Sequence, residues 1–221
     1  MSQQPSTNNY QLKVCGLTKM DQIQELISLN TNFLGFIFYE KSPRFVLNHL
    51  SLEEISEINH QGKVGVFVNE TIEKITEISE KAKLNFIQLH GDEDEEFVKK
   101  LRLSLSKNIK IIKVIRIGND FEKFKNEISK ISNLKSQISN LLFDTDSKVF
   151  GGTGKTFDWQ ILNEIEIPIP YFLSGGISLE NIHQRSTINH QPLALDINSK
   201  FETEPGSKDL EKIKIFKSLL K

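Results

Sequence analysis

The chain alternates eight short apolar runs with segments of helical spacing, and this alternation constrains the fold more than any other feature. The runs are rich in β-branched and aromatic residues and lie at 12–15, 33–38, 64–68, 86–89, 110–117, 141–144, 171–173 and 193–197. Most are apolar at consecutive positions, as expected of strands in a parallel sheet that is buried on both faces. Over 72–82, by contrast, the apolar residues recur on one helical face.

Eight strand–helix units predict a single-domain α/β fold, the (β/α)8 or TIM barrel. Residues 12–221 divided among eight units give about 26 residues per unit, which suits a compact barrel. An open doubly wound sheet is the alternative, but it normally stops at about five or six strands. We therefore assign 12–221 to one barrel domain. Residues 1–11 are polar and contain a proline, so they are expected to form a flexible N-terminal tail.

Short polar residues precede several helical segments and are candidate helix caps. Three pairs resemble a capping box, in which an acidic residue follows the cap by three positions: Thr18 with Asp21, Ser51 with Glu54, and Asp92 with Glu95. Asn69 and Ser178 are further N-cap candidates. The stretch 123–140 is longer than one helix needs, so a helix and a loop are expected there, and a last helix is expected over 209–220.

Composition excludes several classes of protein. Lys and Arg total 28 and Asp and Glu total 29, so the net charge of −1 gives no basic surface for nucleic acid. The longest apolar run, 33–39, is far shorter than the roughly 18 residues of a membrane span. One cysteine excludes an internal disulfide and cysteine-cluster metal sites, and the five histidines are too scattered for a metal site. We expect a cytoplasmic protein without nucleic-acid or membrane partners.

In a barrel, chemistry belongs at the carboxyl ends of the strands and in the loops that follow them. Those positions here carry the strings Lys13-Val-Cys-Gly, Ser42-Pro-Arg-Phe, Gln88-Leu-His-Gly, Leu141-Leu-Phe-Asp-Thr, Gly151-Gly-Thr-Gly-Lys-Thr-Phe-Asp-Trp and Ser174-Gly-Gly-Ile. No single string is decisive. As an ordered set that spans residues 12–221, they resemble the phosphoribosylanthranilate isomerase family.

The resemblance implies a (β/α)8 enzyme of tryptophan biosynthesis that uses no cofactor and no metal. The implied reaction is an Amadori rearrangement of N-(5-phospho-β-D-ribosyl)anthranilate to 1-(2-carboxyphenylamino)-1-deoxy-D-ribulose 5-phosphate. This aldose-to-ketose shift needs an acid to open the sugar ring and a base to remove the C2 proton. The resemblance assigns the acid to Asp144 and the base to Cys15. The partner is then a small phosphorylated substrate, and the enzyme is a monomer or a homodimer.

The residues around the two candidates suggest how their pKa values are set. Lys13 shares its side of the strand with Cys15, so its charge would lower the pKa of the thiol at close approach. Burial, or Asp146 nearby, would raise the pKa of Asp144. Without the resemblance, Cys15 is better interpreted as a buried apolar residue and Asp144 as a turn or cap residue.

The loops after strands seven and eight are expected to bind phosphate, because in barrels they often do so through backbone N–H groups. Gly175 and Gly176 permit close backbone approach after strand seven, and Ser199 supplies donors after strand eight. Gly152 belongs to a loop, 151–154, that is expected to close over the ligand. The alternative for each glycine is an ordinary tight turn.

The resemblance assigns Arg44 to the anthranilate carboxylate, which suits a planar guanidinium group; a surface arginine is the alternative. His90 is a further substrate-binding candidate, with a packing role as the alternative, and Gln88 and Lys13 are supporting residues. Asp196 on strand eight should lie beside Lys13 once the barrel closes. Either a substrate contact or a purely structural ion pair fits Asp196.

Some features fit no assigned role or depart from the family. Lys200-Phe201 stands where the family most often has a glycine, so the backbone of the phosphate loop is uncertain, although Lys200 itself could contact phosphate. The polar stretch 183–191, Arg185 included, has no functional account, and Asp146 is taken as a loop residue. Residues 154–156 end like a nucleotide P-loop, but Val149 replaces its first glycine, so ATP or GTP binding is not expected.

Two rival functions remain. Indole-glycerol-phosphate synthase is a related phosphosugar barrel, but its catalytic lysines and glutamate are not found here. A barrel that only binds a sugar phosphate is the other, and it would need neither Cys15 nor Asp144.

Overall fold

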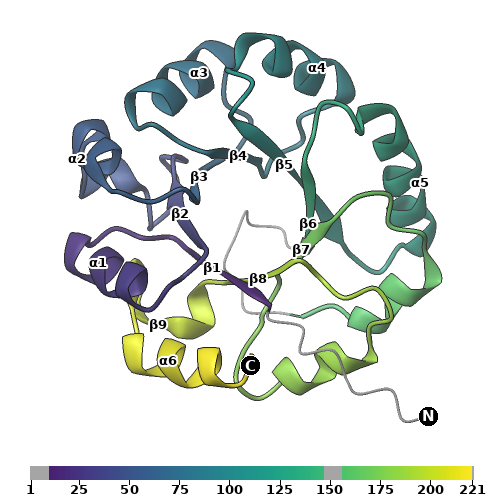
Figure 1. Cartoon of the computed structure of the whole chain (residues 1–221). Helices are drawn as coiled ribbons and strands as arrows, with labels where there is room; N and C mark the ends of the chain where they lie inside the picture. Colours follow the sequence, from purple (N-terminus) through teal and green to yellow (C-terminus); the bar gives the residue numbers. More distant parts are fainter. Residues whose placement is uncertain (1–9, 147–155, 221) are drawn as a thin grey trace, which may run out of the picture.

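The protein is a closed eight-stranded barrel in the computed structural model, which describes residues 10–146 and 156–220. All eight strands are parallel and follow one another around the ring in chain order, with helices outside (Figure 1). The strands are β1 (Gln11–Cys15), β2 (Phe33–Ile37), β3 (Lys63–Phe67), β4 (Phe86–Leu89), β5 (Lys110–Ile117), β6 (Asn140–Thr145), β7 (Tyr171–Leu173) and β8 (Ala194–Ile197). The predicted TIM barrel is confirmed, and every strand lies within one residue of its predicted position at each end.

The helical layer is uneven. Its α-helices are α1 (Met20–Ser28), α2 (Leu52–Glu57), α3 (Ile72–Lys81), α4 (Glu95–Ser104), α5 (Phe121–Ile131) and α6 (Leu210–Ser218). Short 3₁₀ helices are η1 (Val46–Asn48), η2 (Ser132–Leu134), η3 (Trp159–Glu164), η4 (Ile182–Thr187) and η5 (Ser199–Phe201). Among the described residues, the connections from β6 to β7 and from β7 to β8 are therefore 3₁₀ turns where the barrel pattern predicts α-helices.

The barrel interior is apolar in one layer and polar towards the carboxyl ends of the strands. Its apolar layer consists of Phe33, Val64, Phe86, Ile112, Val114, Leu142, Phe172 and Ala194. Side chains alternate between the two faces of a strand, so residues an even number of positions further along each strand also face the interior. In the parallel register, Lys13 pairs with both Phe33 and Asp196. Lys13, Cys15, Gln88, Asp144 and Asp196 thus all face the interior.

The capping predictions succeed at α2 and fail elsewhere. Ser51 and Glu54 form the predicted capping box, each side chain accepting a hydrogen bond from the other's backbone N–H. The N-caps of α1, α3, α4 and η4 are instead Lys19, Thr71, Asp94 and Asn181.

Two of the residues wrongly predicted as caps, Thr18 and Asn69, instead make tertiary hydrogen bonds. The hydroxyl group of Thr18 donates to the carbonyl of Gly206, and the side-chain oxygen of Asn69 accepts from the backbone N–H of Asp92. Each bond joins loops that are distant in sequence, so local sequence does not reveal it.

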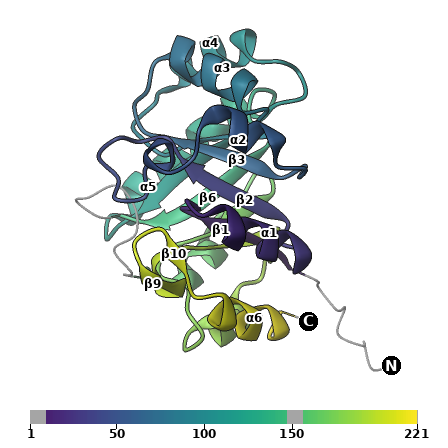
Figure 2. The same cartoon turned by 90° about the vertical axis from the view of Figure 1, so that its left-hand side faces the viewer.

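A hairpin that the sequence did not predict follows β8. Its strands are β9 (Glu202–Glu204) and β10 (Ser207–Lys208), paired antiparallel, and in Figure 2 they lie at the left-hand end of the barrel. Because β9 and β10 follow the carboxyl end of β8 closely, the hairpin lies at the rim of the barrel end that holds the candidate site, near α1 and α6 in Figure 1.

The two ends of the described chain pack onto the barrel. Gln11 starts β1 and Tyr10 packs against the core, so residues 10 and 11, predicted as tail, belong to the barrel. Arg185 lies over the ring of Tyr10 and donates to the carbonyl of Leu219, so the polar stretch 183–191 connects the barrel's termini. In the described part of the chain, no helix is both long and apolar enough to cross a membrane.

Candidate active site

Cys15 lies beside a buried ion pair at the end of β1. Nζ of Lys13 is 2.8 Å from Oδ2 of Asp196 on β8, and both side chains are buried. The predicted neighbourhood of Lys13 and Asp196 is therefore confirmed, because the barrel closes between β8 and β1. Asp196 and Cys15 raise the pKa of Lys13 above its ordinary value against the opposing effect of burial.

The Cys15 thiol has a raised pKa, although Lys13 acts in the expected direction. Burial is the largest cause of the rise, and Asp196 adds to it, while Lys13 and Lys208 lower the pKa. Desolvation disfavours the thiolate more strongly than the two ammonium groups favour it. Burial therefore opposes ionisation of the thiol, and the two lysines favour it.

Space for the sulfur is provided by Gly35 on β2. A Cβ atom at this position would lie 2.9 Å from Sγ of Cys15, closer than atoms of real side chains pack. Gly35 pairs in register with Cys15, so it faces the interior at the same height. The sequence analysis did not single out this glycine; a glycine inside a strand is the signal of close approach that could have revealed it.

Asp144 on β6 belongs to a second polar chain. Nε2 of His90 lies 3.3 Å from Oδ2 of Asp144, and the Gln88 amide nitrogen lies 2.9 Å from Nδ1 of the same ring. An amide nitrogen only donates, so in this arrangement Nδ1 accepts and the proton of a neutral ring is on Nε2, facing Asp144. His90 therefore contacts Asp144, while the carboxylate of Asp146 packs near Gly118.

Arg44 is 9% exposed, so the alternative of a surface arginine is wrong. Its Nε and Nη2 atoms bind the carboxylate of Glu202 in a fork, at 2.6–3.0 Å. Glu202 also accepts from Nζ of Lys208 at 2.6 Å. Burial opposes ionisation of Glu202, but its bonds to Arg44 and Lys208 lower its pKa below the ordinary value. Glu202 and Lys208 are functional candidates that sequence reasoning missed.

Two buried acceptor atoms at the site have no hydrogen-bond partner among the described residues. They are Oε1 of Gln88 and Oδ1 of Asp196, on side chains that face the barrel interior. An unpaired buried acceptor is costly and rare, and a bound ligand is one of the standard explanations. The two atoms are therefore placed to accept hydrogen bonds from hydroxyl groups inside the barrel mouth.

The loop after β7 has a left-handed backbone at two consecutive glycines. Gly175 and Gly176 have φ angles of 85° and 67°, which favour glycine. A Cβ atom on Gly175 would lie 2.4 Å from Oγ1 of Thr145 and 3.2 Å from Oδ1 of Asp144, so only glycine lets this loop pack beside the candidate acid.

After β8, Ser199 begins the turn η5. Neither Lys200 nor Phe201 has a left-handed backbone, and Phe201 is buried against Phe216. The departure from the family's glycine therefore requires no left-handed backbone at Lys200 or Phe201. Gly152 and its loop, and Val149 of the rejected P-loop, lie outside the described residues. No group of three His, Cys, Asp or Glu side chains in the described ranges could hold a metal ion.

The sequence and fold match one family throughout. Residues 12–218 match the family model described as PRAI, N-(5'-phosphoribosyl)anthranilate (PRA) isomerase. The N-(5'-phosphoribosyl)anthranilate isomerase of Parabacteroides distasonis is 38% identical over 210 residues, covering 93% of this chain and 90% of the relative. The isomerase of Trichodesmium erythraeum is 38% identical over 226 residues, covering 94% and 96%.

Solved structures of phosphoribosyl anthranilate isomerases have the same fold as this chain. The phosphoribosyl anthranilate isomerase of Thermotoga maritima superimposes with a TM-score of 0.76 at 33% identity, covering 94% of this chain and 96% of that one. A phosphoribosyl anthranilate isomerase in complex with reduced 1-(o-carboxyphenylamino)-1-deoxyribulose 5-phosphate superimposes with a TM-score of 0.74 at 29% identity, covering 95% and 97%. This chain belongs to the N-(5'-phosphoribosyl)anthranilate isomerase family.

Proposed function

We propose that this chain performs its family's isomerisation by general acid–base catalysis, with Asp144 as the acid and Cys15 as the base. The supporting observation is that both side chains face the barrel interior at the carboxyl ends of β1 and β6. Lys13 shares the interior face of β1 with Cys15, and His90 lies 3.3 Å from Asp144. In the ring order, β7 and β8 separate β1 from β6, so the two groups act from different sides of the mouth. A sugar between them would meet both.

The chemistry assigns one proton transfer to each group. Asp144 in its protonated form gives a proton to the furanose ring oxygen, and the C1–O bond breaks as the lone pair of the anthranilate nitrogen forms a protonated imine. The Cys15 thiolate then removes the C2 proton, and the released electron pair forms the C1–C2 double bond while the C1–N π electrons return to nitrogen, which gives a neutral enolamine. Protonation at C1 and loss of the C2 hydroxyl proton complete the ketose. Lys13 favours the thiolate electrostatically in the step that needs it.

The substrate's ends are assigned to Arg44 and to the glycine loop. Glu202 already occupies the Nε and Nη2 edge of Arg44, so the anthranilate carboxylate would use the guanidinium's other edge, towards Nη1. The backbone at Gly175 and Gly176, with Ser199 and Gly152, would hold the phosphate. Gln88 and Asp196 would accept hydrogen bonds from sugar hydroxyls through their unpaired buried oxygens, with His90 next to them.

The test is a fluorescence assay of freshly generated phosphoribosylanthranilate with purified protein. Cys15→Ala and Asp144→Asn should each lower kcat by about 10²–10⁴-fold, the range of a lost acid or base, while circular dichroism shows an intact fold. Inorganic phosphate should compete with the substrate. Near-normal turnover in either variant would remove that residue from the mechanism, and turnover unaffected by phosphate would remove the glycine-loop assignment.

The two rival functions make different predictions. A sugar-phosphate binder would bind the substrate without turnover. An indole-glycerol-phosphate synthase would instead consume the product of this reaction. The family match over residues 12–218 favours the isomerase over both.

A further inference from the structure

Lys208 lies on β10 of the hairpin. It is a deeply buried charged residue near the site, and it has no role in the proposed mechanism. Its side chain is fully buried, although a lysine normally keeps its ammonium group in water. Nζ donates to Oε1 of Glu202 at 2.6 Å and to Oδ1 of Asn198 at 2.9 Å. Such burial has a cost that these two bonds offset only in part, and burial lowers the pKa of Lys208.

The contacts of Lys208 lead directly to the candidate base. Asn198, its hydrogen-bond partner, lies against Gly16, since a Cβ atom on Gly16 would be 2.9 Å from the same Oδ1 atom. Gly16 is the residue next to Cys15. Lys208 and Cys15 are close enough that each affects the other's proton affinity, Lys208 lowering the pKa of the thiol and the thiolate raising the pKa of Lys208.

The charges around the thiol form two ion pairs. Lys13 on β1 is held by Asp196 on β8, and Lys208 on β10 is held by Glu202 on β9. Further out, Arg44 binds Glu202, while Asp144 and His90 act on Asp196. Asp196 raises the pKa of Cys15, and the two lysines lower it. The effect of Lys13 on the thiol is opposed by its partner Asp196. A second ammonium group at this position adds to the stabilisation of the thiolate.

We propose that Lys208 is a positioning residue that stabilises the Cys15 thiolate together with Lys13, and that the β9–β10 hairpin serves to place this second ammonium group at the base. The inference rests on the proposed function of Cys15. Glu202 then links two tasks, because one carboxylate orients Arg44 for the substrate and fixes Lys208 for the thiol.

The test measures thiol ionisation and catalysis separately in the full chain. In Lys208→Met, the pH dependence of Cys15 alkylation by iodoacetamide, without substrate, should shift to higher pH. A rise of one pKa unit lowers the thiolate fraction about tenfold below the pKa, so kcat near neutral pH should fall about tenfold or more, with KM nearly unchanged. The alkaline limb of the pH profile of kcat should shift to higher pH by the same amount.

Matched variants keep the outcome interpretable. Lys19→Met removes an exposed lysine that donates to Ser207 on the same hairpin, and it should leave both readouts at wild-type values. Glu202 keeps its fork with Arg44 in Lys208→Met, which favours an intact fold. If that variant does not fold, Lys208→Gln retains a polar group without the charge and should give the same shift. Lys208→Arg should restore much of the wild-type titration.

Two results would separate the inferences. An unshifted alkylation profile in a folded Lys208→Met or Lys208→Gln variant would overturn the role of Lys208, whatever happens to kcat. Wild-type turnover in Cys15→Ala would overturn the proposed base, while the alkylation profile would still report whether Lys208 acts on the thiol.

Discussion

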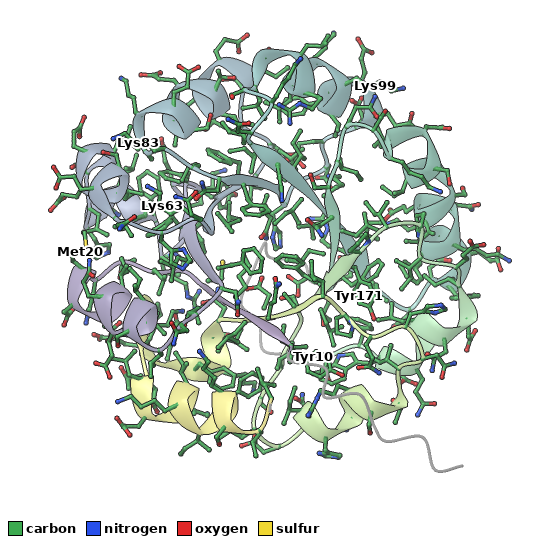
Figure 3. All side chains as sticks on the ribbon, in the orientation of Figure 1. Tyr10, Met20, Lys63, Lys83, Lys99 and Tyr171 are labelled. Atoms are coloured by element: carbon green, nitrogen blue, oxygen red, sulfur yellow. The ribbon has the colours of Figure 1, made fainter. Side chains whose placement is uncertain are left out.

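Two buried lysines on the barrel strands, Lys13 and Lys63, show how differently its interior and its outer layer treat a charge. Lys13 faces the interior and pairs with the Asp196 carboxylate beside the Cys15 thiol. Lys63 starts β3 and lies on the α2–α3 side of the barrel (Figure 3). Its ammonium group donates to the carbonyls of Ile55, Ser56 and Ala82 at 3.0–3.3 Å.

The difference lies in the compensating groups. Asp196 raises the pKa of Lys13. Among the described residues, the ammonium group of Lys63 has only carbonyl partners, and burial lowers its pKa to about 8 with a smaller effect from Lys83. The carbonyls belong to the last turns of α2 and α3, where the helix dipole favours a cation. Lys63 therefore attaches two helix ends to the barrel, while Lys13 holds a charge available for chemistry. Three substitutions test this contrast.

The largest effect is expected from Lys13→Met. Removing one partner of a buried ion pair leaves Asp196 uncompensated, which should lower the free energy of unfolding by about 3–5 kcal/mol. Losing the charge beside the base should also lower kcat by at least about tenfold. Urea denaturation and the fluorescence assay measure the two effects. Adding Asp196→Leu should recover stability but not kcat; recovery of both would make the pair structural only.

A smaller effect is expected where a methyl group is added beside Cys15. Gly35→Ala would place a Cβ atom 2.9 Å from Sγ, so overpacking should cost about 1–3 kcal/mol and also displace the thiol, lowering kcat. Gly65→Ala on β3 is the matched control, because its Cβ atom would meet Leu84 and Phe67. It should destabilise the protein without a selective loss of kcat. Equal kcat in the two variants would show that thiol position is unimportant.

The smallest effect is expected from Lys63→Met. This substitution should lower the free energy of unfolding by about 1 kcal/mol near neutral pH and leave kcat unchanged. The folded pKa of about 8 lies below the ordinary 10.5, so between these values the unfolded chain binds more protons than the folded one. The free energy of unfolding of the wild type should therefore rise with pH across this window relative to the variant. Parallel stability curves from pH 8 to 10.5 would contradict the lowered pKa.

How far the sequence predicts the fold depends on whether the signal is local. The runs 86–89, 110–117 and 171–173 coincide with β4, β5 and β7, because strands between a barrel interior and a helical layer are apolar at most of their positions. The cap candidates Thr18 and Asn69 failed because loops from elsewhere in the chain use their side chains. The β9–β10 hairpin was not predicted, because residues 202–208 are mostly polar and show no strand pattern.

The candidate site divides in the same way. The family resemblance carried by the strings at strand ends nominated Cys15, Asp144 and Arg44. Barrel closure, which brings strand eight beside strand one, nominated Asp196. Glu202 and Lys208 were not nominated, because a polar hairpin residue is normally exposed. The effect of Lys13 on the thiol had the predicted sign, but the net direction for Cys15 depended on how deeply the sulfur is buried.

The barrel, its strand positions and the family follow from local sequence, because hydrophobic periodicity and motif order can be read directly along the chain. Which charges are buried, and which groups compensate each of them, depends on tertiary contacts. Lys13 and Lys63 are both lysines on apolar strands, and nothing local distinguishes them. Barrel closure places Asp196 beside Lys13, whereas helix packing places carbonyls around Lys63. Desolvation and Coulomb interactions depend on these neighbours, which come from distant parts of the chain.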